Sequence, residues 1–250
     1  MISALTYEWR RLWSVRSTWV VSGLYLLITG LLGALPIYLV GENFKQSWNG
    51  LYSTNANFLC LVMLGIVASQ SWGHEYRYGM IRITFSEFPA REKVVVAKTL
   101  VLFVYVTLMV VLAWSLLGLI GATAPAGRIS KANPGMSLAT GSDHVPDLWK
   151  VFVFSLAYAL FSSSLVMIAR NLALGIVLPL LLATTIESLI ILLANLAKGR
   201  MDWFAHSLPF TNGQAWLAGT SDLRQPGLVF AAWVVGLFLL ANIRIAKSDA

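Results

Sequence analysis

The chain has 250 residues, of which 58% are hydrophobic and only 12% are charged. Soluble domains carry roughly 25% charged residues, so this composition excludes a disordered chain and argues strongly against a soluble enzyme. A single cysteine excludes a disulfide framework and Cys-based zinc or iron–sulfur sites, and the net charge of +7 makes the location of the basic residues informative.

Six apolar runs of low charge each approach or exceed the roughly 20 residues that cross a bilayer. They cover residues 19–40, 51–73, 99–123, 151–169, 172–197 and 227–243. Backbone amides in lipid need internal partners, and these runs lack the alternation of barrel strands, so we expect helices. The predicted fold class is an all-α membrane protein of six transmembrane helices, forming a single domain over residues 1–250.

The distribution of Lys and Arg predicts the orientation. With the N-terminus in the cytoplasm, 11 of the 18 Lys and Arg residues fall in the shorter cytoplasmic segments and 7 in the outer ones. Since cytoplasmic loops carry an excess of basic residues, both termini are predicted to be cytoplasmic.

Residues 2–18 are predicted to form an amphipathic helix at the membrane surface. Its apolar residues recur at helical spacing on one face, and Glu8, Arg10 and Arg11 occupy the rest. Two interpretations stay open: a plain interfacial anchor, or an anchor whose polar side also touches a cytoplasmic partner.

The cytoplasmic segment 74–93 carries charges of both signs together with Tyr and Met. Lipid binding alone would favour basic residues, whereas aromatics, Met and Arg are enriched at protein interfaces. The segment therefore favours a short helix docked against a protein over an ordinary solvated loop. His74-Glu75 does not begin a zinc-protease motif, because Tyr78 stands where the second His is required.

Two outer segments are predicted. The semi-apolar segment 198–226 is too broken to span and favours a re-entrant or interfacial pair of short helices. In the loop 124–149, Asp143, His144 and Asp147 could bind a metal only weakly, and we expect a solvated loop with no metal site.

Glu187 is the one ionisable residue well inside a span. A charge near the bilayer centre costs roughly 2.5–3.5 kcal/mol, so Glu187 is a functional candidate. It could line or gate a pathway, or it could pair with an outer Arg or Lys. Pro179 is expected to kink the same helix, and the serines 162–164 and Asn171 are expected to form hydrogen bonds between helices.

Several catalytic and nucleotide-binding motifs are absent from the sequence. There is no phosphate-binding loop of the Gly-x-x-x-x-Gly-Lys-Ser/Thr type, no Gly-x-Ser-x-Gly and no His-Glu-x-x-His. No pair of intramembrane carboxylates is present either. We therefore expect no catalysis by this chain alone, no cofactor within it and no nucleic-acid partner.

Three stretches resemble the ABC-2 type permeases, which are membrane subunits of one class of ATP-binding cassette exporters, and in particular their six-span actinobacterial members. They are residues 8–19 (EWRRLWSVRSTW), residues 75–82 (EYRYGMIR) with Pro89, Arg91 and Lys98 after them, and residues 208–210 (LPF) with Gly213. The C-terminal residues 247–250 (KSDA) are similar to that group's tail. Met80 is a departure, since the group often has Thr there.

The resemblance implies a permease that dimerises with a second copy or a related chain in a bacterial cytoplasmic membrane. Two copies of a separate ATPase subunit would bind ATP and Mg²⁺ and drive alternating access. The amphipathic helix and segment 74–93 would dock that ATPase, and spans two and five would line the path. The implied coupling residues are Glu8, Arg11, Glu75, Tyr76, Arg77, Gly79 and Arg82. The implied path or gate residues are Pro179, Glu187, Leu208, Pro209 and Phe210.

Two other functions remain possible on the sequence. A stand-alone carrier or intramembrane enzyme built on Glu187 would be active alone and would be abolished by Glu187→Gln. A structural assembly factor would show no substrate dependence.

Overall fold

The computed structural model describes residues 2–39, 48–87, 91–125, 129, 145–196, 202–218 and 225–247. Among these residues, the regular elements are all helices, and six of them are long and apolar enough to cross a membrane. These six cover Arg16–Leu39, Gly50–Arg77, Arg91–Ala122, Leu148–Ala169, Leu172–Leu196 and Pro226–Lys247. The predicted all-α fold with six candidate spans is confirmed.

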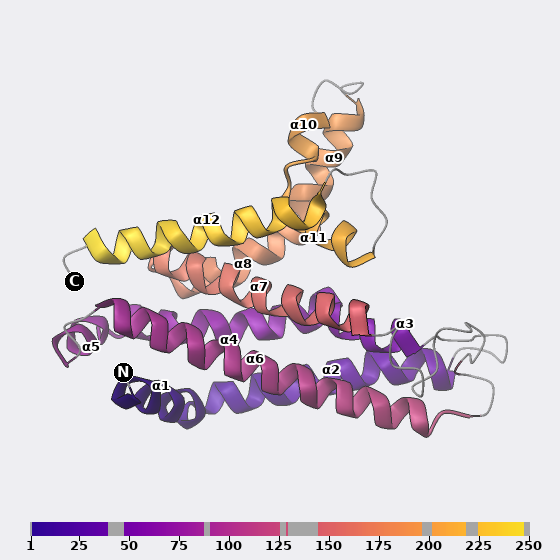
Figure 1. Cartoon of the computed structure of the whole chain (residues 1–250), viewed down its shortest axis with the longest axis horizontal. Coiled ribbons are helices and arrows are strands. Elements are labelled where there is room, and N and C mark those ends of the chain that lie inside the picture. The colour runs from indigo at the N-terminus through magenta and orange to yellow at the C-terminus, as the bar shows by residue number, and fades with distance from the viewer. Residues whose placement is uncertain are drawn as a thin grey trace.

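The elements follow one another along a bundle whose long helices run side by side (Figure 1). In chain order they are α1 (Ile2–Ser14), α2 (Arg16–Leu39), α3 (Trp48–Ser53), η1 (Thr54–Ala56), α4 (Phe58–Arg77), α5 (Ile81–Glu87), α6 (Arg91–Ala122), α7 (Val145–Ala169), α8 (Leu172–Leu181), η3 (Leu182–Ile186), α9 (Glu187–Leu196), α10 (Asp202–Ala205), α11 (Pro209–Ala218) and α12 (Pro226–Lys247).

The N-terminal amphipathic helix is shorter than predicted. α1 ends at Ser14, and α2 begins at Arg16, three residues before the expected start of the first span. Val15 separates the two helices. α1 packs against α6, where Trp13 meets Tyr105 edge-on with ring centroids 6.0 Å apart. The apolar face of α1 is therefore used against the bundle.

The centre of the bundle is the contact between α4 and α7. Gly65 of α4 makes it possible, because a Cβ there would lie 2.7 Å from Tyr158 Cε1 and 2.9 Å from Ser162 Oγ. α2 and α6 pack beside α4, while α11 and α12 cover the other side of α7. The core thus follows the long helices from end to end.

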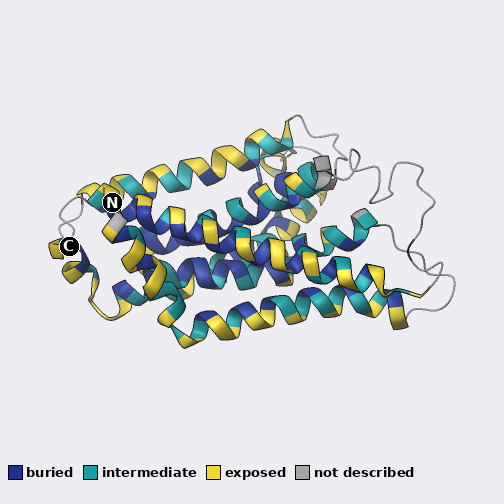
Figure 2. Cartoon of the chain, turned by 60° about the horizontal axis from the view of Figure 1, so that its bottom comes forward, coloured by how far each residue is buried: buried dark blue, intermediate teal, exposed yellow. Residues whose placement is uncertain are grey.

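The outward faces of the long helices are apolar as well. Figure 2 shows the buried residues turned inward, with exposed residues along the outside of each long helix. On α2 the exposed residues Leu24, Leu27, Leu31 and Leu35 recur at helical spacing. An apolar face turned away from the rest of the protein is typical of a membrane span.

The serines of α7 do not act as predicted. Ser163 and Ser164 donate to the carbonyl oxygen of Leu160 in their own helix. A hydroxyl on a helix satisfies itself most easily on the carbonyl three or four residues earlier. Side chains of α2 do form hydrogen bonds to other helices, with Ser22 Oγ 2.8 Å from Tyr105 OH and Thr29 Oγ1 3.2 Å from Cys60 Sγ.

The fifth candidate span changes direction. A π turn, η3, follows three residues after Pro179, and beyond it α9 and α10 lie away from the bundle (Figure 1). Only α8 packs closely on α4 and α7. Proline removes one backbone hydrogen bond, and π turns are a recognised cause of sharp bends, which gives the bend a local origin.

Candidate functional site

The predicted docking elements lie at one end of the bundle. α1, α5, the C-terminal end of α4 and the last turn of α12 are all found there (Figure 1). The eleven Lys and Arg residues assigned to the cytoplasm lie at or near helix ends on this side. They are Arg10, Arg11, Arg16, Arg77, Arg82, Arg91, Lys93, Lys98, Arg170, Arg244 and Lys247.

Inside this end, Lys98 of α6 lies between two carboxylates. Its Nζ is 2.8 Å from Glu8 Oε1 of α1 and 2.8 Å from Glu75 Oε1 of α4. The same Nζ donates to the carbonyl oxygen of Ser71 at 3.3 Å and lies 5.0 Å from the centroid of the Trp72 ring. One ammonium group therefore connects three helices.

Arg11 closes the cluster from α1. It pairs with Glu75, and its Nη1 lies 3.2 Å from Glu8 Oε2. Its Nη2 donates to Ser71 O at 3.1 Å. Thr84 of α5 reaches the same group, with its hydroxyl donating to Glu75 Oε1 at 3.4 Å. We refer to Glu8, Arg11, Glu75 and Lys98 as the ion-pair cluster.

The cluster is buried and electrically balanced. Glu75 is 1% exposed, Lys98 2% and Glu8 6%. Removing a charge from water is expensive, and the expense is recovered only when each ion has close partners of opposite sign and further hydrogen bonds. Two carboxylates and two cations, with Ser71 and Thr84 adding hydrogen bonds, meet this condition. Loss of any one member would leave a buried charge uncompensated.

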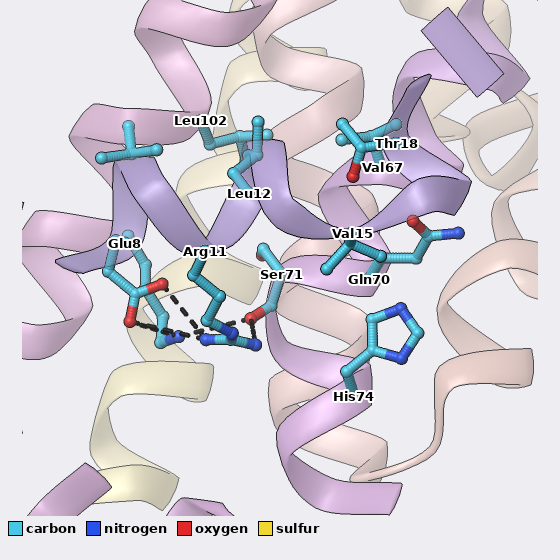
Figure 3. A pocket seen from close by; sticks show the side chains of 12 residues that line it. Glu8, Arg11, Leu12, Val15, Thr18, Val67, Gln70, Ser71, His74 and Leu102 are labelled. Atoms are coloured by element: carbon cyan, nitrogen blue, oxygen red, sulfur yellow. Dashed lines mark hydrogen bonds and ion pairs between the residues drawn. The ribbon is translucent and has the colours of Figure 1, made fainter. Parts of the chain in front are cut away.

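A small cavity of about 30 Å³ adjoins the cluster between α1, α4 and α6. Figure 3 shows Glu8, Arg11 and Ser71 turned toward one another, with Gln70 and His74 along the same wall. Two buried polar atoms here, His74 Nε2 and Glu75 Oε2, have no hydrogen-bond partner among the described residues. A cavity of this size has room for a water molecule, and the polar groups of the cluster lie along part of its wall.

The other predicted coupling residues lie outside the cluster. Tyr76 stacks on Trp72 with ring centroids 6.5 Å apart, and the Arg77 guanidinium lies 5.7 Å from the Tyr78 ring. Gly79 has φ +66°, which glycine adopts without strain, and so permits the turn into α5. Arg82 is exposed on α5. The structure therefore brings Glu8, Arg11 and Glu75 together, whereas Arg82 lies on the exposed surface of α5.

Sequence reasoning missed Lys98 as a site residue. It stands in the sequence as one basic residue immediately before a long apolar run, the usual position of a membrane anchor. The available signal was the acidic charge of Glu8 and Glu75 on either side of the first two spans, since buried carboxylates need a cation. Pro89 of the resembling pattern lies outside the described residues.

No protein-family model and no curated protein matches the chain.

A second buried charge lies toward the other end of the bundle. Glu187, at the start of α9, is 2% exposed. Its carboxylate accepts from the backbone amides of Phe210 and Thr211 at 2.8 and 2.6 Å, and from the Thr211 hydroxyl at 2.7 Å. The carboxylate therefore caps the first turn of α11, whose amides have no partner within the helix.

The structural alternative raised by the sequence, a pairing of Glu187 with an outer Arg or Lys, stays a prediction, because Lys198, Arg200 and Arg224 lie outside the described residues. Among the described residues no ion pair includes Glu187, and its partners are at the start of α11. A helix N-terminus carries a partial positive charge, so it can compensate a carboxylate in place of a cation.

The remaining gate candidates pack around this cap. Leu208 and Phe210 are buried, and the Phe210 ring lies 5.1 Å from Phe161 and 5.7 Å from Tyr158 of α7. At the far end of α11, Trp216 meets Trp149, near the start of α7, at 5.2 Å. α11 therefore runs from the middle of α7 toward its start. Pro209 is the first residue of α11, a position that suits a missing amide proton.

The described residues contain no group of three or more His, Cys, Asp or Glu side chains suited to a metal ion. Asp143 and His144 lie outside the described residues, and the side chain of Asp147 is likewise not described.

Proposed function

We propose that the chain is the permease subunit of an ATP-binding cassette exporter in a bacterial cytoplasmic membrane. It would work as a dimer with a second permease and would move substrate by alternating access. Two copies of a separate ATPase subunit would bind ATP and Mg²⁺ and supply the energy. The motif resemblance suggests this class, and the ion-pair cluster is the structural observation that supports it best.

The cluster fits a device that transmits movement from a docked partner to the spans. It joins α1 to the spans α4 and α6 and receives a hydrogen bond from α5. α5 itself is short and exposes Arg82 and Ile83. A push on α5 or α1 would reach both spans through charged groups whose separation is costly. In this proposal Arg82 contacts the ATPase, while Glu8, Arg11 and Glu75 carry the movement inward.

The opposite end fits an outer gate. Glu187 joins the bent fifth helix to α11, and α11 places Phe210 among the aromatic rings of α7. A change in the bend at η3 would therefore move Phe210. The segment 198–226 would form the re-entrant part of this gate, and the role of Glu187 would be to hold α11 in position.

Affinity purification of the tagged chain from its native membrane tests the proposal. A soluble ATPase should co-elute in a fixed ratio, and its ATP hydrolysis should depend on this chain. Arg82→Glu should abolish co-elution without changing the amount of folded chain, because the side chain is exposed. Lys247→Glu, exposed on the last turn of α12, is the matched control and should leave co-elution intact. A chain that elutes alone in mild detergent would contradict the proposal.

The orientation is testable by cysteine labelling. Cys60, the native thiol, is buried and should give little background. Ser86→Cys on α5 should react with an impermeant maleimide only from the cytoplasmic face, and Trp149→Cys at the other end only from outside. Labelling of both from one face would contradict the proposed topology.

A further inference from the structure

A groove lined by two arginines lies at the basic end of the bundle, on the side of α4 away from the ion-pair cluster. It has an open volume of about 480 Å³ between the end of α4 and the start of α8. Arg77 and Arg170 lie at its polar part, and Leu172, Ala173 and Ile176 form its apolar part. Cations and apolar side chains therefore line one continuous groove.

Within the described part of the chain, neither guanidinium has an acidic partner. Among the described residues, no ion pair and no side-chain hydrogen bond includes Arg77 or Arg170. A third cation is close, since Arg170 and Arg244 both act electrostatically on the Tyr76 hydroxyl. The nearby carboxylate, Glu75, is already engaged by Arg11 and Lys98. Positive charge here is left without a counter-ion from the described part of the chain.

The backbone at Arg170 gives a second indication. Arg170 has φ 54° and, with Asn171, forms the whole link between α7 and α8. Glycine is the usual residue for this left-handed conformation at the end of a helix. An arginine in a strained position points to a use for its side chain.

The packing of α8 fixes the geometry of the groove. Gly73 of α4 lets Leu172 approach so closely that a Cβ at position 73 would lie 2.5 Å from Leu172 Cδ1. The groove therefore has a rigid floor. Asn171 accepts from the Ala173 amide at 2.9 Å and starts α8 directly beside the two arginines.

We propose that this groove binds the phosphate of an anionic phospholipid headgroup. Arg77 and Arg170 contact the phosphate, because guanidinium groups match phosphate oxygens in shape and charge. One acyl chain lies along Leu172 and Ile176, which continue from the arginines into the span. Phosphate is the shared chemistry of a lipid headgroup and a soluble phosphate ester. The apolar half of the groove favours the lipid. The proposal does not depend on the exporter function.

Native mass spectrometry of the delipidated, purified chain in a neutral detergent tests the proposal. The probes are phosphatidylglycerol, diacylglycerol without phosphate, and free glycerol 3-phosphate. The chain should retain phosphatidylglycerol and release diacylglycerol. The double variant Arg77→Gln, Arg170→Gln should bind phosphatidylglycerol at least about tenfold more weakly, as expected for lost hydrogen bonds to a charged group.

Two further variants separate the guanidinium from other effects. Arg170→Gly keeps the left-handed turn and removes the charge, so it should lose affinity as Arg170→Gln does. Arg16→Gln removes an exposed arginine at the same end of the bundle but outside the groove, and it should bind phosphatidylglycerol as the unaltered chain does. All variants should show the same elution volume, since among the described residues these arginines form no ion pair and no side-chain hydrogen bond.

The outcomes are distinct. Loss in the groove variants, with glycerol 3-phosphate failing to displace the lipid, supports the lipid site. Displacement by millimolar glycerol 3-phosphate overturns the lipid as the source of the phosphate. Equal affinity in the double variant and the unaltered chain, or equal loss in Arg16→Gln, overturns the site itself. None of these readouts involves an ATPase, so failure of this proposal and failure of the exporter proposal are distinguishable.

Discussion

Replacing Lys98 by Met removes the cation that lies between two buried carboxylates. Glu8 and Glu75 would then share only Arg11, and the cluster would carry one uncompensated negative charge. Met keeps most of the length and apolar volume of the lysine stem, so the packing beside Trp72 changes little. The effect should therefore report charge.

The expected loss of stability is large. Breaking a buried ion pair by removing one partner costs about 3–5 kcal/mol. Lys98 and Glu75 are both almost fully buried, so solvent screening gives little relief. For a chain of this size, 1 kcal/mol corresponds to a shift of about 2–4 °C in Tm, which predicts a fall of about 6–20 °C.

Thermal unfolding in detergent, followed by tryptophan fluorescence, measures this fall. Lys93→Met is the matched control, because Lys93 is exposed on the same helix and its loss should change stability by less than about 0.5 kcal/mol. Adding Glu75→Gln to Lys98→Met should recover part of the lost stability, since Glu8 and Arg11 then remain as a neutral pair. Equal Tm values for Lys98→Met and Lys93→Met would refute the reasoning.

Glu187→Leu should loosen α11, because two buried amides lose their acceptor at a cost of about 2–4 kcal/mol, and hydrogen exchange of residues 209–218 should rise about 30- to 700-fold. Ser188→Ala, at the exposed neighbouring position, should leave that exchange unchanged, and equal exchange in both variants would count against the cap. Gly175→Ala should cost about 1–3 kcal/mol by overpacking, since its Cβ would lie 2.1 Å from Val166 Cγ2, and a lower Tm measures it. A Cβ added at Gly236 has no atom within 4 Å, so Gly236→Ala should leave the free energy of unfolding unchanged or raise it by up to about 1 kcal/mol. A lower Tm for Gly236→Ala than for Gly175→Ala would be inconsistent with the packing of α8.

The fold was accessible from the sequence because membrane spans are long and nearly free of charge. The apolar runs predicted six helices, and the described residues form six of adequate length. The boundaries were less accurate at the N-terminus, where a single residue, Val15, separates α1 from α2. Hydropathy does not change sharply there, so it could not place the break.

The candidate site was only partly accessible. The resemblance to the permeases drew attention to Glu8, Arg11 and Glu75, but it implied contacts with a docked partner rather than a buried cluster. Their burial depends on how α1 folds back against α6, which is a tertiary event with no local sequence signal. The cap on α11 was hidden for a similar reason, because Glu187 bonds to backbone amides, and backbone donors are the same in every sequence.

The link between Glu187 and α11 bears on how the chain is made. Glu187 precedes Thr211 by 24 residues, and chains grow at about 5–20 residues per second, so Glu187 leaves the ribosome roughly 1–5 s before the Thr211 amide that donates to it. During that interval the carboxylate is without its cap. The contact between the fifth helix and α11 is therefore completed late in biogenesis, after residues 210 and 211 have been made, whereas the bend at η3 has a local origin.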